Sequence, residues 1–520
     1  MHNKDIAQYT FRQRTTSDNK RTRKNVVSLE KTPKLSFAAM RHSATVKCIN
    51  QIICSPWGIG ILGIFTVLAF AFSLEIEFYT FVVLYAIYVG IFAEDFSPLI
   101  PLFVLCYVTP ATSNNPGMSA SGLFYGRTAT YLVCIVCAGV LVLLLRIILD
   151  KELGIHRLFT TKRRLLWGML ALGVAYFLSG ILHEQYSEYA KGNLLFASIQ
   201  FVSVFLLYFL FSATVKWDRF HLDYFAWCGL IIGLVVAAEV GCIYLTQNII
   251  VDGIIIRSNI SSGWGCYNNI GALISISIPF AFYFACYKKR SSVFLVLAAL
   301  LFTAVIFSGS RGSLIGAIVA FTASYILTFR KGKNKKEFRI TSLVLVGVIS
   351  VLVLVFHETL NGAFDQIPGL GHMNGDQFIW DDSDRFATYK NGFQVFLRNP
   401  IFGQSFYPIE CDLYSFSQLA QFTSFFPPRW HNTIVQMLAS CGTVGVIAYV
   451  YNRVDTVILF CKKRSTAKTY IAFSILTLLV MSLLDCHFFN VGPVLFYSTA
   501  LAVMEFWSPA AKSKHPHKTI

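Results

Sequence analysis

Long apolar blocks divide this chain of 520 residues. A helix needs about 20 mostly apolar residues to cross a hydrocarbon core about 30 Å thick, and many of the blocks approach that length. The pattern therefore predicts an all-α polytopic membrane protein with about 12–14 transmembrane helices. The expected spans are 57–74, 78–93, 97–110, 129–149, 165–183, 194–215, 224–247, 269–287, 292–309, 313–329, 341–357, 432–452, 469–486 and 490–507.

Composition and charge support a membrane location. Hydrophobic residues make up 55% of the chain and charged residues only 14%, whereas about a quarter of a soluble domain is charged. The net charge of +17 is concentrated at the termini and in short gaps between apolar blocks. Cytoplasmic loops of membrane proteins carry such Lys and Arg clusters, so we expect a multi-pass protein of the cytoplasmic (inner) membrane with both termini in the cytoplasm. The same distribution argues against a nucleic-acid partner.

The gaps between the blocks suggest five regions. They are a basic cytoplasmic tail (1–50), transmembrane helices with their connecting loops (51–357), a large extracytoplasmic loop (358–431), C-terminal transmembrane helices (432–507) and a cytoplasmic tail (508–520). The large loop is rich in aromatic residues, and its segment 384–397 has the period of an amphipathic helix that ends before Pro400. The second and third spans are short and can alternatively form a re-entrant pair.

Ionisable residues are expected to gather at the extracytoplasmic ends of the predicted spans. They are Arg257, Arg311, Arg385, Arg429, His431, Asp485 and His487. Arginine offers a planar fork of donors that matches phosphate oxygens, and histidine exchanges protons near neutral pH. Because charges near a membrane are costly, such residues are candidates for function, and together they suggest group transfer from a phosphorylated lipid.

Four motifs follow one another in a characteristic order. They are the Arg-, Gly- and Asn-rich segment 257–272, the Ser-Arg-Gly turn 308–316, the loop helix from Asp384 to a Pro-x-x-Gly ending at Gly403, and His431-Asn432 followed by Gly442 and Gly445. In order and in loop position they resemble the O-antigen ligase/O-antigen polymerase superfamily of bacterial lipid-linked glycan transferases. The similarity covers about 257–450.

This resemblance implies a glycosyltransferase that takes an undecaprenyl-diphosphate-linked glycan as donor. The acceptor would be a hydroxyl on a glycan, on a lipid A-core or on a protein, at the outer face of the membrane. By position, Arg257 and Arg311 would hold the diphosphate, with Arg311 stabilising the charge that grows as the sugar–phosphate bond breaks. Arg385 and Arg429 would add substrate contacts, and His431 would orient or deprotonate the acceptor hydroxyl.

Alternatives remain open on the sequence alone. Ligation, repeat-unit polymerisation and protein O-glycosylation share the donor chemistry, and a lipid-linked glycan transporter or flippase is a candidate from a different class. Arg311 can instead serve as a helix-end residue, and Asp485 and His487 are more easily read as structural.

The acidic run Asp381-Asp382-Ser383-Asp384 precedes the loop helix, where capping explains it better than a metal does. We therefore expect a metal-independent enzyme without cofactors. The 13 cysteines form no recognisable disulfide framework, and pairing of Cys266 with Cys411 stays open.

Overall fold

The computed structural model describes most of the hydrophobic part of the chain. The described residues are 43–105, 126–150, 155–181, 187–247, 249–251, 254–255, 260–262, 265–355, 372–374, 377–379, 383–406 and 430–508.

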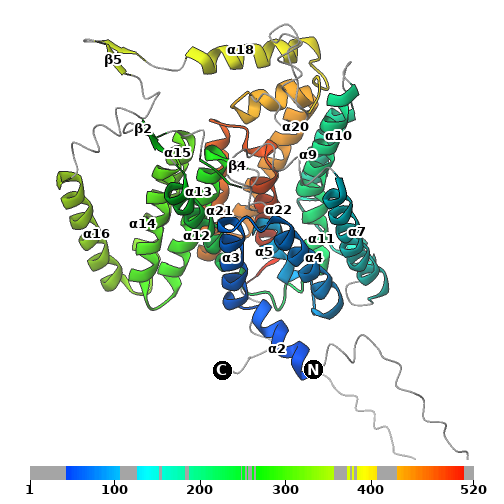
Figure 1. The fold of residues 1–520 in the computed structure, drawn as a ribbon, viewed down its shortest axis with the longest axis horizontal. Coiled ribbons are helices and arrows are strands. Elements are labelled where there is room, and N and C mark those ends of the chain that lie inside the picture. Colours follow the sequence, from blue (N-terminus) through cyan, green and yellow to red (C-terminus); the bar gives the residue numbers. More distant parts are fainter. Residues whose placement is uncertain are drawn as a thin grey trace, which may run out of the picture.

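Helices dominate these residues (Figure 1). The first half contains α2 (Ala44–Ile53), α3 (Pro56–Ala71), α4 (Glu75–Phe92), the 3-10 turn η1 (Ser97–Leu99), α5 (Ile100–Leu105), α7 (Gly126–Leu149), α8 (Ile155–Thr160), α9 (Leu166–Ile181), α10 (Ser187–Phe201), the π-helical turn η3 (Val202–Leu206), α11 (Leu207–Thr214) and α12 (Leu222–Thr246). The second half contains α13 (Tyr267–Tyr287), α14 (Ser291–Phe307), α15 (Arg311–Lys331), α16 (Lys335–Val355), α18 (Ser383–Arg398), α20 (Thr433–Lys462), α21 (Thr466–Ser482), the 3-10 turn η5 (His487–Phe489) and α22 (Val491–Phe506).

Within the described residues, strands are confined to three short antiparallel pairs, which the sequence did not predict. β1 (Ile250–Val251) pairs with β2 (Ile254–Ile255), β3 (Ser261–Ser262) with β4 (Gly265–Cys266), and β5 (His372–Asn374) with β6 (Gln377–Ile379).

The fold class predicted from the sequence is confirmed, because the described chain is an all-α polytopic membrane protein. By length and composition, five described helical segments can cross a membrane, namely 194–214, α12, α13, α15 and α20. The pair α2 and α3, bent by 69°, adds a sixth if it counts as one span. Each predicted span overlaps a described helix, but several of the other apolar helices have only 10–17 residues. The exact number of crossings therefore stays a prediction.

Side-chain caps explain where several of these helices begin. Ser55, Ser310, Asn432 and Ser465 each have extended backbone and accept a first-turn N–H of α3, α15, α20 and α21, respectively. These N–H groups have no partner within the helix, so a cap of this kind fixes the first residue of the helix.

The centre of the bundle is α13, which packs against α12, α14, α15 and α21. Of the 18 most apolar consecutive residues of α13, 94% are buried inside the protein. Small residues permit this close packing: a Cβ added at Gly271 would lie 2.7 Å from the hydroxyl oxygens of both Ser308 and Ser313. This close approach brings the start of α13 against the start of α15.

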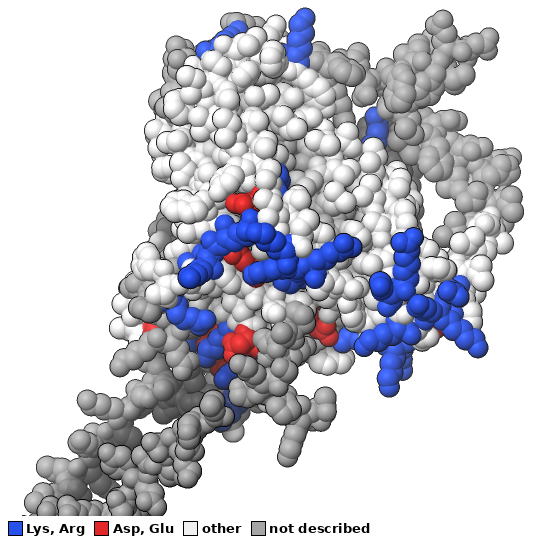
Figure 2. Space-filling model, turned by 180° about the vertical axis from the view of Figure 1, so that it is seen from behind, with Lys and Arg blue, Asp and Glu red and all other residues white. Residues whose placement is uncertain are grey.

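The two ends of the bundle differ in charge. The helix α18 lies across one end, transverse to the bundle helices (Figure 1). On the face drawn in Figure 2, Lys and Arg side chains gather toward the opposite end. The basic connections α8–α9, α13–α14, α15–α16 and α20–α21 supply them. We call the end that carries α18 the site end. Its extracytoplasmic location remains a prediction from the charge pattern.

Candidate active site

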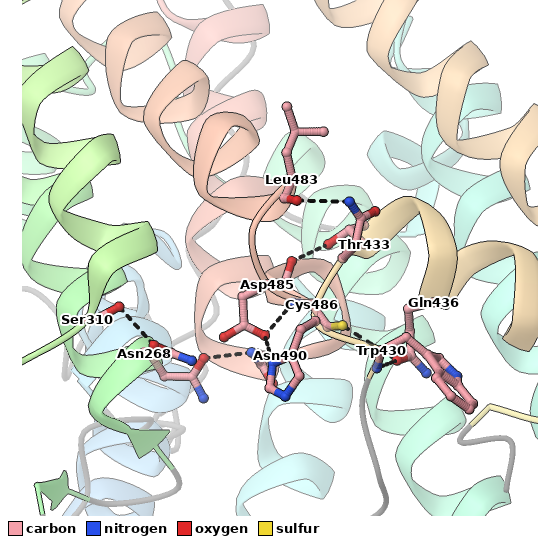
Figure 3. Close-up of polar contacts among 12 residues, drawn as sticks. Asn268, Ser310, Trp430, Thr433, Gln436, Leu483, Asp485, Cys486 and Asn490 are labelled. Carbon is pink, nitrogen blue, oxygen red and sulfur yellow. Dashed lines mark hydrogen bonds and ion pairs between the residues drawn. The ribbon is translucent and has the colours of Figure 1, made fainter. Parts of the chain in front are cut away.

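The starts of α13, α15, α20 and α22 meet at the site end, around the connection between α21 and α22 (Figure 3). The Ser310 hydroxyl, which caps α15, donates to Asn268 Oδ1 at 2.9 Å. Asn490 Nδ2 donates to Asn269 Oδ1 at 2.6 Å and so ties the start of α22 to the start of α13.

The start of α20 is fastened to the same connection. Asn432 Nδ2 donates to the Leu483 carbonyl at 2.8 Å, and the Thr433 hydroxyl donates to the Asp485 carbonyl at 3.1 Å. Four helix starts are therefore held together by polar contacts rather than by apolar packing alone.

Arg311 is the first residue of α15 and is half-buried. The chain reaches it through Gly309, whose φ of 69° ends α14, and through the Ser310 cap. A Cβ added at the next residue, Gly312, would lie 3.2 Å from the Leu484 Cβ, so the start of α15 runs close to the α21–α22 connection. The predicted Ser-Arg-Gly turn thus places Arg311 at the site end.

His431 faces Asp485. Its Nδ1 lies 3.5 Å from the Asp485 Oδ1, and the two side chains are 44% and 11% exposed, respectively. His431 has a φ of 47°, and Ser73 is the only other described non-glycine residue with a positive φ. Such strained positions persist only where the surroundings enforce them, and they are frequent at functional sites. Here the Asn432 side chain enforces the turn by accepting the N–H groups of Ile434 and Val435.

The environment of Asp485 stabilises its charge. Burial alone would raise the pKa of this carboxyl, but the imidazoles of His431 and His487 and the N–H of Cys486 together lower it well below its usual value. The Cys486 N–H donates to Asp485 Oδ1 at 2.7 Å. Asp485 lies outside both α21 and α22 and is a permanent anion beside His431 at neutral pH. The sequence favoured a structural role for it, and no local motif marks its proximity to His431.

The helix α20 is broken at Gly442, although the sequence predicted one continuous span over 432–452. Gly442 has a φ of 64° and a ψ of −160°. The segment 399–406, which follows α18, fills the break. The Thr443 N–H donates to the Pro400 carbonyl at 2.9 Å, the Val444 N–H to the Ile401 carbonyl at 3.1 Å, and the Gln404 N–H to the Ala439 carbonyl at 2.9 Å.

These bonds replace helical bonds that the break removes, so the loop segment completes the helix. Gly403, with a φ of 75°, lies against Gly442: a Cβ on Gly442 would come within 2.5 Å of the Gly403 nitrogen. The Pro-x-x-Gly ending and the glycine after His431-Asn432, distant in sequence, therefore form one joint.

The predicted loop helix is confirmed as α18, and it touches the site. The Tyr389 hydroxyl donates to the His431 carbonyl at 3.3 Å. Gly392 packs against the Trp430 ring, and Val395 is fully buried. Arg385 lies in the first turn of α18.

Some predicted features cannot be placed. Arg257, Arg429, Asp381, Asp382 and Cys411 lie outside the described residues. Within the described residues, no group of three or more His, Cys, Asp or Glu side chains is arranged to hold a metal ion.

Residues 293–450 match a family model that is described as O-antigen ligase. This segment belongs to the O-antigen ligase superfamily. The matched segment contains Arg311, Arg385, Arg429 and His431, whereas Arg257 precedes it and Asp485 follows it. The family implies a glycosyltransferase-like ligase activity in general. No curated protein matches the chain.

Proposed function

We propose that this O-antigen ligase-like protein is a membrane glycosyltransferase. It moves a glycan from an undecaprenyl-diphosphate carrier to an acceptor hydroxyl on the outer face of the bacterial cytoplasmic membrane. The observation that supports the proposal best is the pair of His431 and Asp485, placed where four helix starts meet near Arg311. In this proposal 358–431 is extracytoplasmic and both chain termini are cytoplasmic.

The site end suits an anionic donor. Each helix start carries roughly half a positive charge, which attracts anions even where caps such as Ser310 and Asn432 already accept some of the first-turn N–H groups. Arg311 adds a planar fork that can hold two phosphate oxygens at once. Negative charge on the diphosphate grows as the bond to the sugar breaks, so groups fixed in this position stabilise the transition state more than the bound donor.

His431 acts as the general base. Asp485 faces Nδ1 of the imidazole and orients the ring, which leaves Nε2 for the acceptor. As the acceptor oxygen bonds to the anomeric carbon, Nε2 takes the hydroxyl proton. The bond from that carbon to the diphosphate breaks, and undecaprenyl diphosphate leaves with the bonding electrons. Asp485 stabilises the imidazolium that results. No metal is needed for this step. Arg257, Arg385 and Arg429 are proposed as further substrate contacts.

Ligation to a lipid A-core, polymerisation of repeat units and protein O-glycosylation all use this step and differ only in the acceptor. The proposal therefore fixes the donor class and the direction of transfer, and the acceptor is to be identified by the glycan product that accumulates in cells.

The test is His431→Ala in cells that depend on this protein. We expect lipid-linked glycan to accumulate, the glycan product to disappear, and the protein to remain in the membrane at its normal level. His221→Ala is the control, because His221 is exposed at the start of α12, next to Asp223, in the basic connection after α11. Normal product formation by His431→Ala would remove this residue from the mechanism.

A further inference from the structure

Besides Arg311, a further arginine lies near the candidate active site. Arg453 is in the half of α20 that follows the break at Gly442. Its guanidinium carbon is 3.9 Å from the ring centroid of Phe488, 4.3 Å from that of Tyr449 and 4.4 Å from that of Tyr497. The rings come from η5, α20 and α22, so this one cation contacts three elements. A cation over an aromatic face is attracted by the ring quadrupole, most strongly away from water.

The burial of a charged residue such as Arg453 inside a helix bundle costs free energy. Its Nε, Nη1 and Nη2 atoms are buried, and none makes a hydrogen bond of ordinary geometry within the described residues, although the Tyr497 side chain lies close by. Burial of a cation without acceptors costs free energy, which a methionine or leucine of similar reach would avoid. Ionisable residues inside membrane helices are therefore candidates for function.

Phe488 connects this cation to the candidate active site. It stands three residues after Asp485, in the turn 485–490. Its carbonyl accepts the Tyr176 hydroxyl at 2.8 Å and Gln200 Nε2 at 2.6 Å, so its backbone is fixed from α9 and α10. Its ring is fully buried and meets Tyr449 and Tyr497 edge-on, at 5.6 and 5.2 Å between centroids.

We propose that Arg453 is a positioning residue for the active site. Its stack on Phe488 holds the turn 485–490 in the place where the Asp485 carboxylate meets His431. The rings of Tyr449 and Tyr497 fix the guanidinium, the guanidinium fixes the Phe488 ring, and the ring fixes the backbone that carries Asp485. Arg453 touches no substrate. The inference rests on the proposed function only for its effect on transfer, because the Asp485–His431 contact can be measured without substrate.

The measurement uses the full-length protein in lipid nanodiscs. Diethyl pyrocarbonate modifies histidine at a rate that depends on exposure and on the partner of the ring, and mass spectrometry of the peptides reads the rate at His431. Asp485→Asn removes the carboxylate and defines the signature of a lost pair. We expect Arg453→Met and Phe488→Leu to change the His431 rate in the same direction as Asp485→Asn, by at least twofold.

Matched controls separate positioning from general loosening. Phe489→Leu removes the neighbouring buried ring, which packs on Tyr176 and Phe406 at 5.2 and 5.3 Å between centroids. Arg339→Met removes a guanidinium that stacks on Phe329 at 4.8 Å, at the start of α16. Both should leave the His431 rate within the error of wild type. Arg453→Lys keeps the charge but loses the flat stacking surface, so it should resemble Arg453→Met.

The double variant Arg453→Met/Phe488→Leu should change the rate no more than the larger single variant does, because both residues act along one route. The inference is overturned if Phe488→Leu leaves the rate unchanged, or if Phe489→Leu changes it equally. It is also overturned if a folded Arg453→Met or Arg453→Lys variant leaves the rate unchanged, and Arg453→Lys serves as the test where Arg453→Met does not fold. If the rates behave as expected but His431→Ala still transfers glycan, the proposed catalytic role of His431 fails while the positioning role of Arg453 stands.

Discussion

The substitution Gly442→Ala should destabilise the site end more than the addition of a methyl group at any other position in α20. The backbone there has a φ of 64° and a ψ of −160°, a region open almost only to glycine. A Cβ would lie 2.4 Å from the Ile401 carbonyl oxygen and 2.5 Å from the Gly403 nitrogen. Both are backbone atoms and cannot turn aside as a side chain can, so either the helix or the segment 399–406 must move.

The expected magnitude follows from what that movement breaks. Strain at such a position costs about 1–3 kcal/mol. Displacement of the segment also removes the bonds from Thr443, Val444 and Gln404, each worth about 1 kcal/mol. Since part of the strain is relieved when the bonds break, we expect a loss of about 4 kcal/mol, which is a large fraction of the stability of an ordinary domain.

Thermal unfolding in nanodiscs and glycan transfer by the surviving folded protein are the two assays. Transfer should fall further than the folded fraction does, because His431 directly precedes the first half of α20 and would move with it. Gly347→Ala in α16 is the matched control: nothing lies within 4 Å of its added Cβ, so it should be neutral or slightly stabilising. Wild-type behaviour of Gly442→Ala in both assays would refute the conclusion that the segment 399–406 packs into the break of α20 at Gly442.

Four further outcomes are expected. Arg311→Lys should lose most glycan transfer in cells, as Arg311→Ala does, because an ammonium cannot make the two-pronged phosphate contact; near-normal transfer by the lysine variant would favour a helix-end role. Purified protein should transfer glycan in excess EDTA. If EDTA abolishes transfer and added Mg²⁺ or Mn²⁺ restores it, the proposal that arginines hold the diphosphate without a metal is wrong. The lowered pKa of Asp485 means that its charge stabilises the fold above the usual Asp value of about 4, and that this contribution is lost as the pH falls from there through the folded value. The difference in Tm between wild type and Asp485→Asn should thus shrink as the pH falls below about 4; a difference that does not change there would assign control to another group. Asp376→Cys should react with an impermeant thiol reagent on spheroplasts while Lys335→Cys stays protected, and the reverse pattern would invert the topology.

Periodic features of this molecule could be predicted from sequence because they depend on local patterns. Apolar blocks of membrane length gave the helices, and the stripe over 384–397 gave α18 to within a residue at each end. The Ser-Arg-Gly turn was predicted between the spans 292–309 and 313–329, and there Gly309 and the Ser310 cap begin α15.

Features that depend on tertiary contacts could not be predicted. Asp485 follows His431 by more than fifty residues, and only the packing of α20 against the α21–α22 connection makes them partners. The break at Gly442 likewise needs the carbonyls of Pro400 and Ile401, which no pattern within α20 reveals. A lone glycine in an apolar helix is compatible with an unbroken span.

The meeting of four helix starts has a consequence for inhibitors and for resistance to them. The partial positive charge at these starts belongs to peptide groups, so it does not depend on the protonation of a side chain, and among the substitutions only proline removes one of the N–H groups. A dianionic compound shaped to the starts of α13, α15, α20 and α22 would be held partly by these backbone atoms. Loss of this part of the binding would require a proline in a first turn or a shift of a helix, and the contacts that join Asn269 to Asn490 and Asn432 to Leu483 oppose that shift.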